Sequence, residues 1–179
     1  RARLFADDMA DLAILTLADL FWIAESDRPV EERNWERILT TLRMLQEWGA
    51  RSDVPLLRIA AIRAQIVVYA EYLEDLAGAL ALGEATLVEV SADARLAYLL
   101  YEVLGRHCLM ADRVTEGLAW LRAALAQPIE GFPWLRVMTY LSASAATSNQ
   151  DPDAALAYAG AAVQLAEAST AVINVDVIK

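Results

Sequence analysis

The sequence has little cysteine, histidine, glycine or proline, and each shortage excludes a class of structure. Its 179 residues include one cysteine, Cys108, and one histidine, His107. A single cysteine cannot form an intrachain disulfide, so we expect a protein of a reducing compartment such as the cytoplasm. The two residues together also cannot supply the four ligands of a structural zinc site. With only 7 glycines and 5 prolines, a sandwich or barrel with punctuated hairpins is disfavoured.

The chain also lacks basic runs and long apolar runs. Its formal net charge is −10, which repels phosphate backbones, so we expect no direct contact with nucleic acid. The most apolar stretch, 12–24, is interrupted by Asp19 and falls short of the roughly 20 apolar residues that a membrane span needs. We therefore expect no membrane partner. The sequence starts at Arg1 without an initiator methionine and without a signal-peptide pattern, and we expect it to be a fragment of a larger protein.

What the chain does contain favours packed helices. Hydrophobic residues make up 58% of it, with 35 alanines and 27 leucines. Alanine and leucine are among the best helix formers, and the length suits one domain spanning 1–179. Aspartate, serine or proline precedes most apolar segments of period 3.6, as at the start of helices. We expect eight helices, at 5–25, 30–48, 55–73, 75–89, 92–110, 113–126, 133–148 and 152–168.

Two positions at the ends of these segments have a less definite interpretation. Asp112 precedes the segment 113–126 and is a candidate N-cap for it. The tail 172–178 alternates weakly, which fits a strand, the first turn of a ninth helix or a frayed end.

An internal repeat runs through the helical segments with a constant period of 38. Four leucines share this spacing, and each is preceded by a small residue (Leu42, Leu80, Leu118 and Leu156, after Thr41, Ala79, Gly117 and Ala155). Periods in the range of roughly 20–50 indicate arrays of one supersecondary unit. Here that unit is a pair of helices, and the small residues allow the two helices of a pair to approach closely.

The third pair resembles a tetratricopeptide repeat. It carries an aromatic–Leu–Gly pattern in its first helix, a small–large–small pattern in its second, and a closing proline (Tyr101, Leu104, Gly105 and Cys108, then Gly117, Leu121 and Ala124, then Pro128). Cys108, Gly117 and Leu121 depart from the family pattern, and the period of 38 exceeds the usual ~34. Longer, degenerate repeats of this kind are similar to the helical sensor region of MalT-like LuxR-type transcription regulators.

This resemblance covers about 30–170 and implies an all-α fold, a right-handed α–α superhelix of about four helix pairs. The first helices of such pairs line the concave surface. On these helices a stripe of polar and aromatic residues follows i+3/i+4 steps (Arg58, Gln65, Tyr69, Tyr72, Arg95, Glu102, Arg106, Arg136, Tyr140 and Ser144). The stripe would suit a peptide or a polar ligand, because arginine binds carboxylates and tyrosine offers stacking area. It is equally the pattern of an ordinary solvated helix face.

Two other sets of residues allow both a catalytic or metal-binding interpretation and an ordinary structural one. Asp7, Asp8 and Asp11 spell DDxxD, which holds Mg²⁺ in all-helical prenyl-diphosphate enzymes but also suits a solvated first helical turn. His107 and Cys108 could be a base and a nucleophile, but sequence neighbours on a helix point about 100° apart, and a buried cysteine at a helix contact is the simpler reading. We expect no catalytic residues, no metal and no cofactor.

We therefore expect a non-catalytic module that binds a protein or peptide through the concave face. The alternative is the effector-sensing region of a larger MalT-like regulator, which would bind a small molecule. The lysine-based clamp that some tetratricopeptide proteins use for C-terminal carboxylates is absent, and only Arg106 stands in a comparable place. The C-terminal end of the array is apolar, so we also expect it to pack on another copy or on further sequence. The tryptophans are expected in the core by default, although Trp134, directly after Pro133, could also be half exposed.

Overall fold

The computed structural model describes residues 34–51, 53–129 and 131–177, and they form seven α-helices and one short π-helix with no strand among them. The expected all-α class is confirmed. The helix expected at 5–25 lies outside the described residues. The chain divides into two compact units, Arg1–Ser91 and Ala92–Lys179, so the single-domain expectation stays a prediction. None of the described helices is both long and apolar enough to cross a bilayer.

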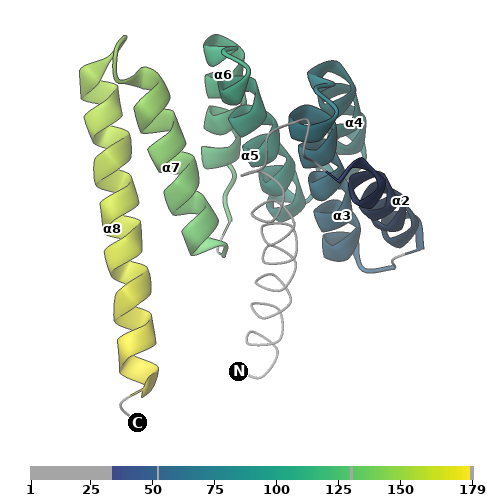
Figure 1. Cartoon of the computed structure of the whole chain (residues 1–179). Helices are drawn as coiled ribbons and strands as arrows, with labels where there is room; N and C mark the ends of the chain where they lie inside the picture. The colour runs from purple at the N-terminus through teal and green to yellow at the C-terminus, as the bar shows by residue number, and fades with distance from the viewer. Residues whose placement is uncertain (1–33, 52, 130, 178–179) are drawn as a thin grey trace. The chain divides into compact units, whose positions relative to one another are not determined.

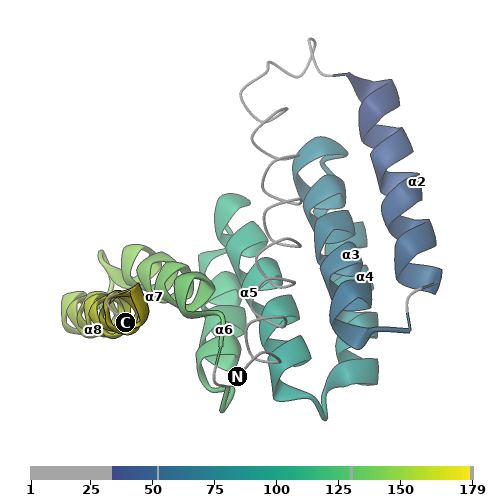
Figure 2. The same ribbon diagram turned by 90° about the horizontal axis from the view of Figure 1, so that it is seen from below.

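The first unit contains α2 (Trp35–Arg51), α3 (Pro55–Val67), the π-helix η2 (Val68–Tyr72) and α4 (Leu76–Val90). Helix α3 packs against both α2 and α4 (Figure 2). The segment expected as one helix at 55–73 is α-helical only as far as Val67, and its last turn is a π-turn closed by a hydrogen bond from the Leu73 N–H to the Val68 carbonyl (3.0 Å). This wider turn packs Val68 and Tyr72 together with Ile38 of α2 in one buried cluster.

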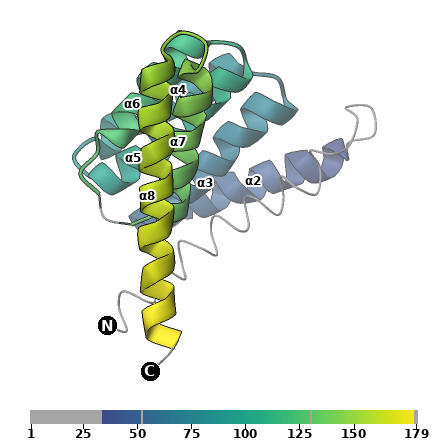
Figure 3. The ribbon, with the colours of Figure 1, turned by 90° about the vertical axis from the view of Figure 1, so that its left-hand side faces the viewer.

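The second unit consists of two helix hairpins. Helices α5 (Ala94–Met110) and α6 (Val114–Leu125) form the first, and α7 (Pro133–Thr147) and α8 (Pro152–Val177) form the second (Figure 1). Helix α7 also packs against α6 and α5, and α8 extends past the end of α7 (Figure 3). The expected end of the last helix at 168 is wrong, because α8 continues without a break to Val177. The segment 172–177 is therefore neither a strand nor a separate helix.

The repeat seen in the sequence is visible in the places where helices begin. The second helices of the pairs start at positions 76, 114 and 152, with the same constant spacing as the four leucines. The first helices start at positions 55, 94 and 133, also at one constant spacing. Three of these six helices begin with proline, and aspartate side chains cap three of them by accepting from main-chain N–H groups (Asp75, Asp93 and Asp151).

Asp112 does not cap α6, contrary to the expectation from sequence. It lies in the left-handed conformation (φ 60°) and ends α5, with hydrogen bonds from Asp112 N–H to Leu109 O (3.1 Å) and from Arg113 N–H to Cys108 O (2.8 Å). This pair of bonds is a Schellman motif. Glu74, one repeat earlier in the chain, has the same conformation (φ 54°). Aspartate is common both at helix starts and in left-handed turns, which is why the sequence pattern misplaced it.

Two glycines bring α5 and α6 into close contact. A Cβ added to Gly105 would lie 2.7 Å from Leu121 Cδ2 and 3.0 Å from the Gly117 carbonyl oxygen. A Cβ added to Gly117 would lie 2.7 Å from Leu109 Cδ2 and 2.9 Å from the Gly105 carbonyl oxygen. Each glycine thus leaves room for the other helix's backbone. The equivalent positions one repeat later, Ala143 and Ala155, are both buried in the second hairpin.

We predict that Gly105→Ala and Gly117→Ala each lower the free energy of unfolding by about 1–3 kcal/mol, because the opposing carbonyl cannot move without shifting a helix. Chemical denaturation monitored by circular dichroism measures this. Gly160→Ala on α8 is the matched control, because its Cβ would meet nothing within 4 Å, and it should stabilise by about 1 kcal/mol. Equal effects at all three positions would contradict the close approach.

We also predict that Glu74→Gly and Asp112→Gly each raise the free energy of unfolding by about 0.5–1 kcal/mol. Glycine adopts the left-handed conformation of these residues without the steric cost that a Cβ imposes. Thermal melts of the single variants test this. Glu84→Gly, inside α4, should instead destabilise by about 1 kcal/mol, and stabilisation there would show that the effect is not conformational.

Candidate functional site

Each arginine near the start of a first helix makes a local contact. Arg58 of α3 forms an ion pair with Glu89 near the end of α4 (Nη2–Oε2 2.6 Å). The guanidinium of Arg95 on α5 lies over the Phe132 ring, 4.7 Å from its centroid. Arg136 of α7 donates to the Ile129 carbonyl oxygen (2.6 Å). The three arginines of the predicted stripe therefore connect their helices to neighbouring segments, which accounts for positive charge at an end that the helix dipole disfavours.

The remaining stripe residues of the first unit are buried or partly buried. Gln65 and Tyr72 are buried, with Tyr72 2% exposed. Tyr72 belongs to the cluster with Ile38 and Val68, and Tyr69 packs against it. Two of these three side chains thus offer almost no accessible area, and the third is only partly exposed.

The other two stripe residues on α7, Tyr140 and Ser144, lie along its contact with α8. The Tyr140 ring is 6.4 Å from that of Tyr158, and the Ser144 hydroxyl donates to the Ala155 carbonyl oxygen (2.8 Å). Arg122 of α6 in turn donates to the Tyr158 hydroxyl (3.4 Å). Tyr140 and Ser144 therefore stabilise the second hairpin.

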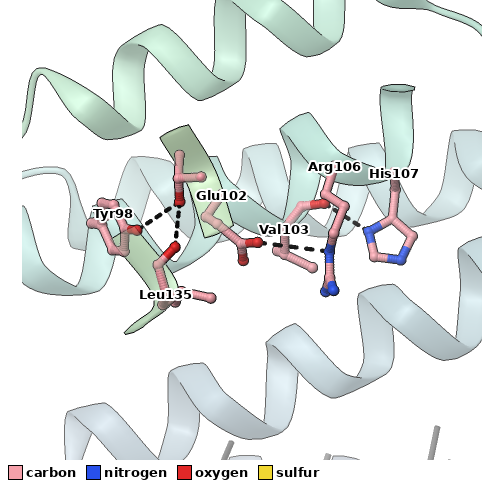
Figure 4. A network of polar contacts seen from close by, with 7 residues as sticks. Tyr98, Glu102, Val103, Arg106, His107 and Leu135 are labelled. Carbon is pink, nitrogen blue, oxygen red and sulfur yellow. Dashed lines mark hydrogen bonds and ion pairs between the residues drawn. The ribbon is translucent and has the colours of Figure 1, made fainter. Parts of the chain in front are cut away.

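Buried polar groups connect α5 to α7. The hydroxyls of Tyr98 and Thr139 lie 2.7 Å apart, and Thr139 donates to the Leu135 carbonyl oxygen (2.8 Å) (Figure 4). Because the single hydrogen of Thr139 goes to that carbonyl, Tyr98 is the donor between the two hydroxyls. Both residues are fully buried. The chain of hydrogen bonds satisfies each hydroxyl inside the unit.

One turn further along α5, a buried carboxylate lies beside a half-exposed arginine. Glu102 is 3% exposed, whereas 33% of the Arg106 side chain is exposed, and Arg106 Nε lies 3.6 Å from Glu102 Oε1 (Figure 4). Burying a carboxylate is costly unless a cation or donors stabilise it. Arg106 supplies that positive charge as an ion-pair partner, and its buried Nε makes no hydrogen bond to any of the described residues. Because a third of its side chain is exposed, Arg106 is the stripe residue on α5 best placed to meet a ligand.

His107 and Cys108 are both in the interior. The His107 Nδ1 atom lies 2.7 Å from the Val103 carbonyl oxygen (Figure 4). A carbonyl only accepts, so Nδ1 carries the proton. Cys108 is fully buried, as the packing interpretation expects. Asp7, Asp8 and Asp11 lie outside the described residues. Among the residues that are described, no group of three or more His, Cys, Asp or Glu side chains is placed to hold a metal ion.

Sequence reasoning missed two participants in these contacts. Thr139 lies against the Tyr98 hydroxyl, and the Phe132 ring lies under the Arg95 guanidinium. Trp120 of α6, at a spacing that predicts helix packing, stacks on Tyr101 of α5 with centroids 5.8 Å apart. A threonine inside an apolar helix is a usable signal, because it must find a carbonyl or a hydroxyl partner. Phe132 gives no such signal, because its position depends on a loop between helices.

In comparisons with known proteins, no family model, no curated protein and no solved structure matches the chain. The tetratricopeptide and MalT-like resemblance stays a prediction from the residues.

We predict that Thr139→Val lowers the free energy of unfolding more than Tyr98→Phe does. The phenylalanine variant loses one hydrogen bond, worth about 1 kcal/mol, whereas valine leaves the buried Tyr98 hydroxyl without its acceptor, which costs about 1–3 kcal/mol. Denaturant titrations of both variants and of the double variant measure this as a double-mutant cycle. Additive effects would mean that the two hydroxyls do not interact.

Proposed function

We propose that the chain is a non-catalytic binding module that recognises a carboxylate-bearing protein segment or peptide through α5, with Arg106 as the contact. The observation that carries this proposal is the pairing of Glu102 and Arg106. The buried Glu102 carboxylate lies 3.6 Å from Arg106 Nε, while 33% of the Arg106 side chain is exposed. A planar guanidinium held in this way is suited to a bidentate contact with a carboxylate.

The other polar groups of the second unit support a binding role more than a catalytic one. Tyr98, Thr139 and His107 make hydrogen bonds to neighbouring helices or to their own turn. A catalytic constellation needs a base and a nucleophile within reach of each other and of a substrate. The described side chains instead hold helices together, so the part of the site left to a ligand is a surface.

The helical-repeat architecture also supports this role. Pairs of helices that recur at a constant period and pack through small residues are the unit from which peptide-binding arrays are built. In such arrays the first helices present side chains to the ligand, and α5 is a first helix. A right-handed superhelix and a place in the tetratricopeptide-like superfamily are part of the same proposal.

A peptide array tests the proposal directly. Each peptide is displayed twice, once with a free C-terminal carboxylate and once as the amide, and the labelled chain is applied to both. We expect the chain to prefer carboxylate forms, and Arg106→Gln to weaken binding by about tenfold or more, as loss of a charged hydrogen bond implies.

The control variant is Arg51→Gln. Arg51 pairs with Glu47 at the same i,i+4 spacing as Arg106 with Glu102, but both members of the Arg51–Glu47 pair are exposed. Arg51→Gln should leave peptide binding unchanged, and circular dichroism should show both variants folded. Equal binding of carboxylates and amides, or equal loss in both variants, would reject Arg106 as the recognition residue.

A further inference from the structure

A row of apolar side chains lies exposed on α7. Trp134, Met138 and Leu141 are 71%, 40% and 43% exposed, and their spacing of four and three residues places them on one side of the helix. Ala145 extends the row by one more turn and is also exposed. Large apolar side chains grouped on a surface in this way indicate an interaction site rather than chance exposure.

Helix α8 continues this surface. Leu156 and Val163 are exposed, and Gly160 lies between them with open space where its Cβ would be. On α7, Ala143 packs with Leu118 and Leu121 of α6, and Trp134 and Leu141 lie on the opposite side at about 100° per residue. On α8, Tyr158 packs against the same cluster, and Leu156 and Val163 again lie opposite. We call this surface of the second hairpin, away from α5 and α6, the outer face (Trp134, Met138, Leu141, Ala145, Leu156, Gly160 and Val163).

Comparison with the preceding repeat shows that the residues equivalent to this face are not exposed there. The residues one repeat before its five large members are all buried or partly buried in the first hairpin (Leu96, Leu100, Val103, Leu118 and Leu125). Two of them, Leu118 and Leu125, belong to the cluster that Ala143 of α7 completes. Leu118 and Leu125 are thus covered by packing against α7, and the other three equivalents are buried. The outer face has the same chemistry and is suited to helices of the same type.

Charge favours a second copy as the occupant. The chain carries a net charge of −10, but α7 contains one charged residue, Arg136, which bonds to Ile129 O. Residues 152–168 of α8 contain only two charged residues, Asp153 and Glu167. Two copies therefore meet through this face with little like-charge repulsion. A strongly charged partner would find nothing to pair with there.

The row on α7 is also complementary to itself. When two copies of α7 cross antiparallel about a two-fold axis, Trp134 of one lies opposite Ala145 of the other, and Met138 lies opposite Leu141. The largest residue then meets the smallest, as a self-complementary interface requires. We propose that the chain forms a homodimer through the outer face, with α7 packed antiparallel on α7 of the second copy. This interface is separate from Arg106 and independent of the proposed function.

Sedimentation velocity over a concentration series tests the dimer. We expect the wild-type chain to shift from monomer to dimer, and the Met138→Glu, Leu141→Glu double variant to raise the dissociation constant by more than tenfold. Val88→Glu is the control, because Val88 on α4 is 80% exposed but lies in the other unit, and it should dimerise like wild type. A wild-type chain that stays monomeric at all concentrations, or equal disruption by Val88→Glu, overturns the proposal.

Cysteine cross-linking tests the register. Chains carrying Met138→Cys and chains carrying Leu141→Cys are mixed and oxidised gently, and the buried Cys108 serves as an internal background. We expect the mixture to form disulfide dimers faster than either chain alone, because the antiparallel register places 138 against 141. Dimers that form without preference for the mixture would overturn the antiparallel register, and folding of every variant is checked by circular dichroism.

Carboxylate peptides should bind the monomeric variant as well as they bind wild type, so that a failure of one proposal leaves the other testable.

Discussion

The contact between Gly105 and Gly117 sets the geometry on which the second unit depends. A Cβ on either glycine would lie 2.9–3.0 Å from the other helix's carbonyl oxygen, so α5 and α6 approach closely at this point. Leu121 and Leu109 then fill the space on either side. Because dense packing leaves no room for adjustment, this contact also fixes where Leu118 and Leu121 meet Ala143 of α7. The equivalent positions of the next hairpin, Ala143 and Ala155, are buried alanines.

Polar side chains act in this structure mainly as connectors between helices. Tyr98 reaches Thr139, Ser144 reaches the main chain of α8, and Arg136 holds the segment before its own helix. Such groups fix the relative position of apolar surfaces that would otherwise slide, because hydrogen bonds are directional and hydrophobic contacts are not. Arg106 differs from them, since it reaches only a nearby carboxylate and keeps part of its surface outside.

The all-α class and most helix positions could be predicted from the sequence, because helix starts and apolar periodicity are local signals. The starts of α3, α4, α5, α7 and α8 fell close to the expected positions. The role of Asp112 was predicted wrongly, because aspartate is common both at helix starts and in the left-handed turns that end helices. The site was harder to predict, because periodicity gives the side of a helix and not what covers it. Tyr72 and Glu102 shared the expected stripe with Arg58, but the first two are buried and the third is exposed.

The recurrence of small residues also bears on how such a chain can change in length. Ala79, Gly117 and Ala155 follow one another at the same interval as the starts of their helices. Insertion or loss of one whole period keeps a small residue at the same position of the second helix, so that the two helices of a pair can still approach. Most other changes in length bring a bulkier side chain to the narrowest point of the contact. The chain can therefore lengthen or shorten over evolution in steps of one complete hairpin, because each added hairpin brings its own small residue to the helix contact.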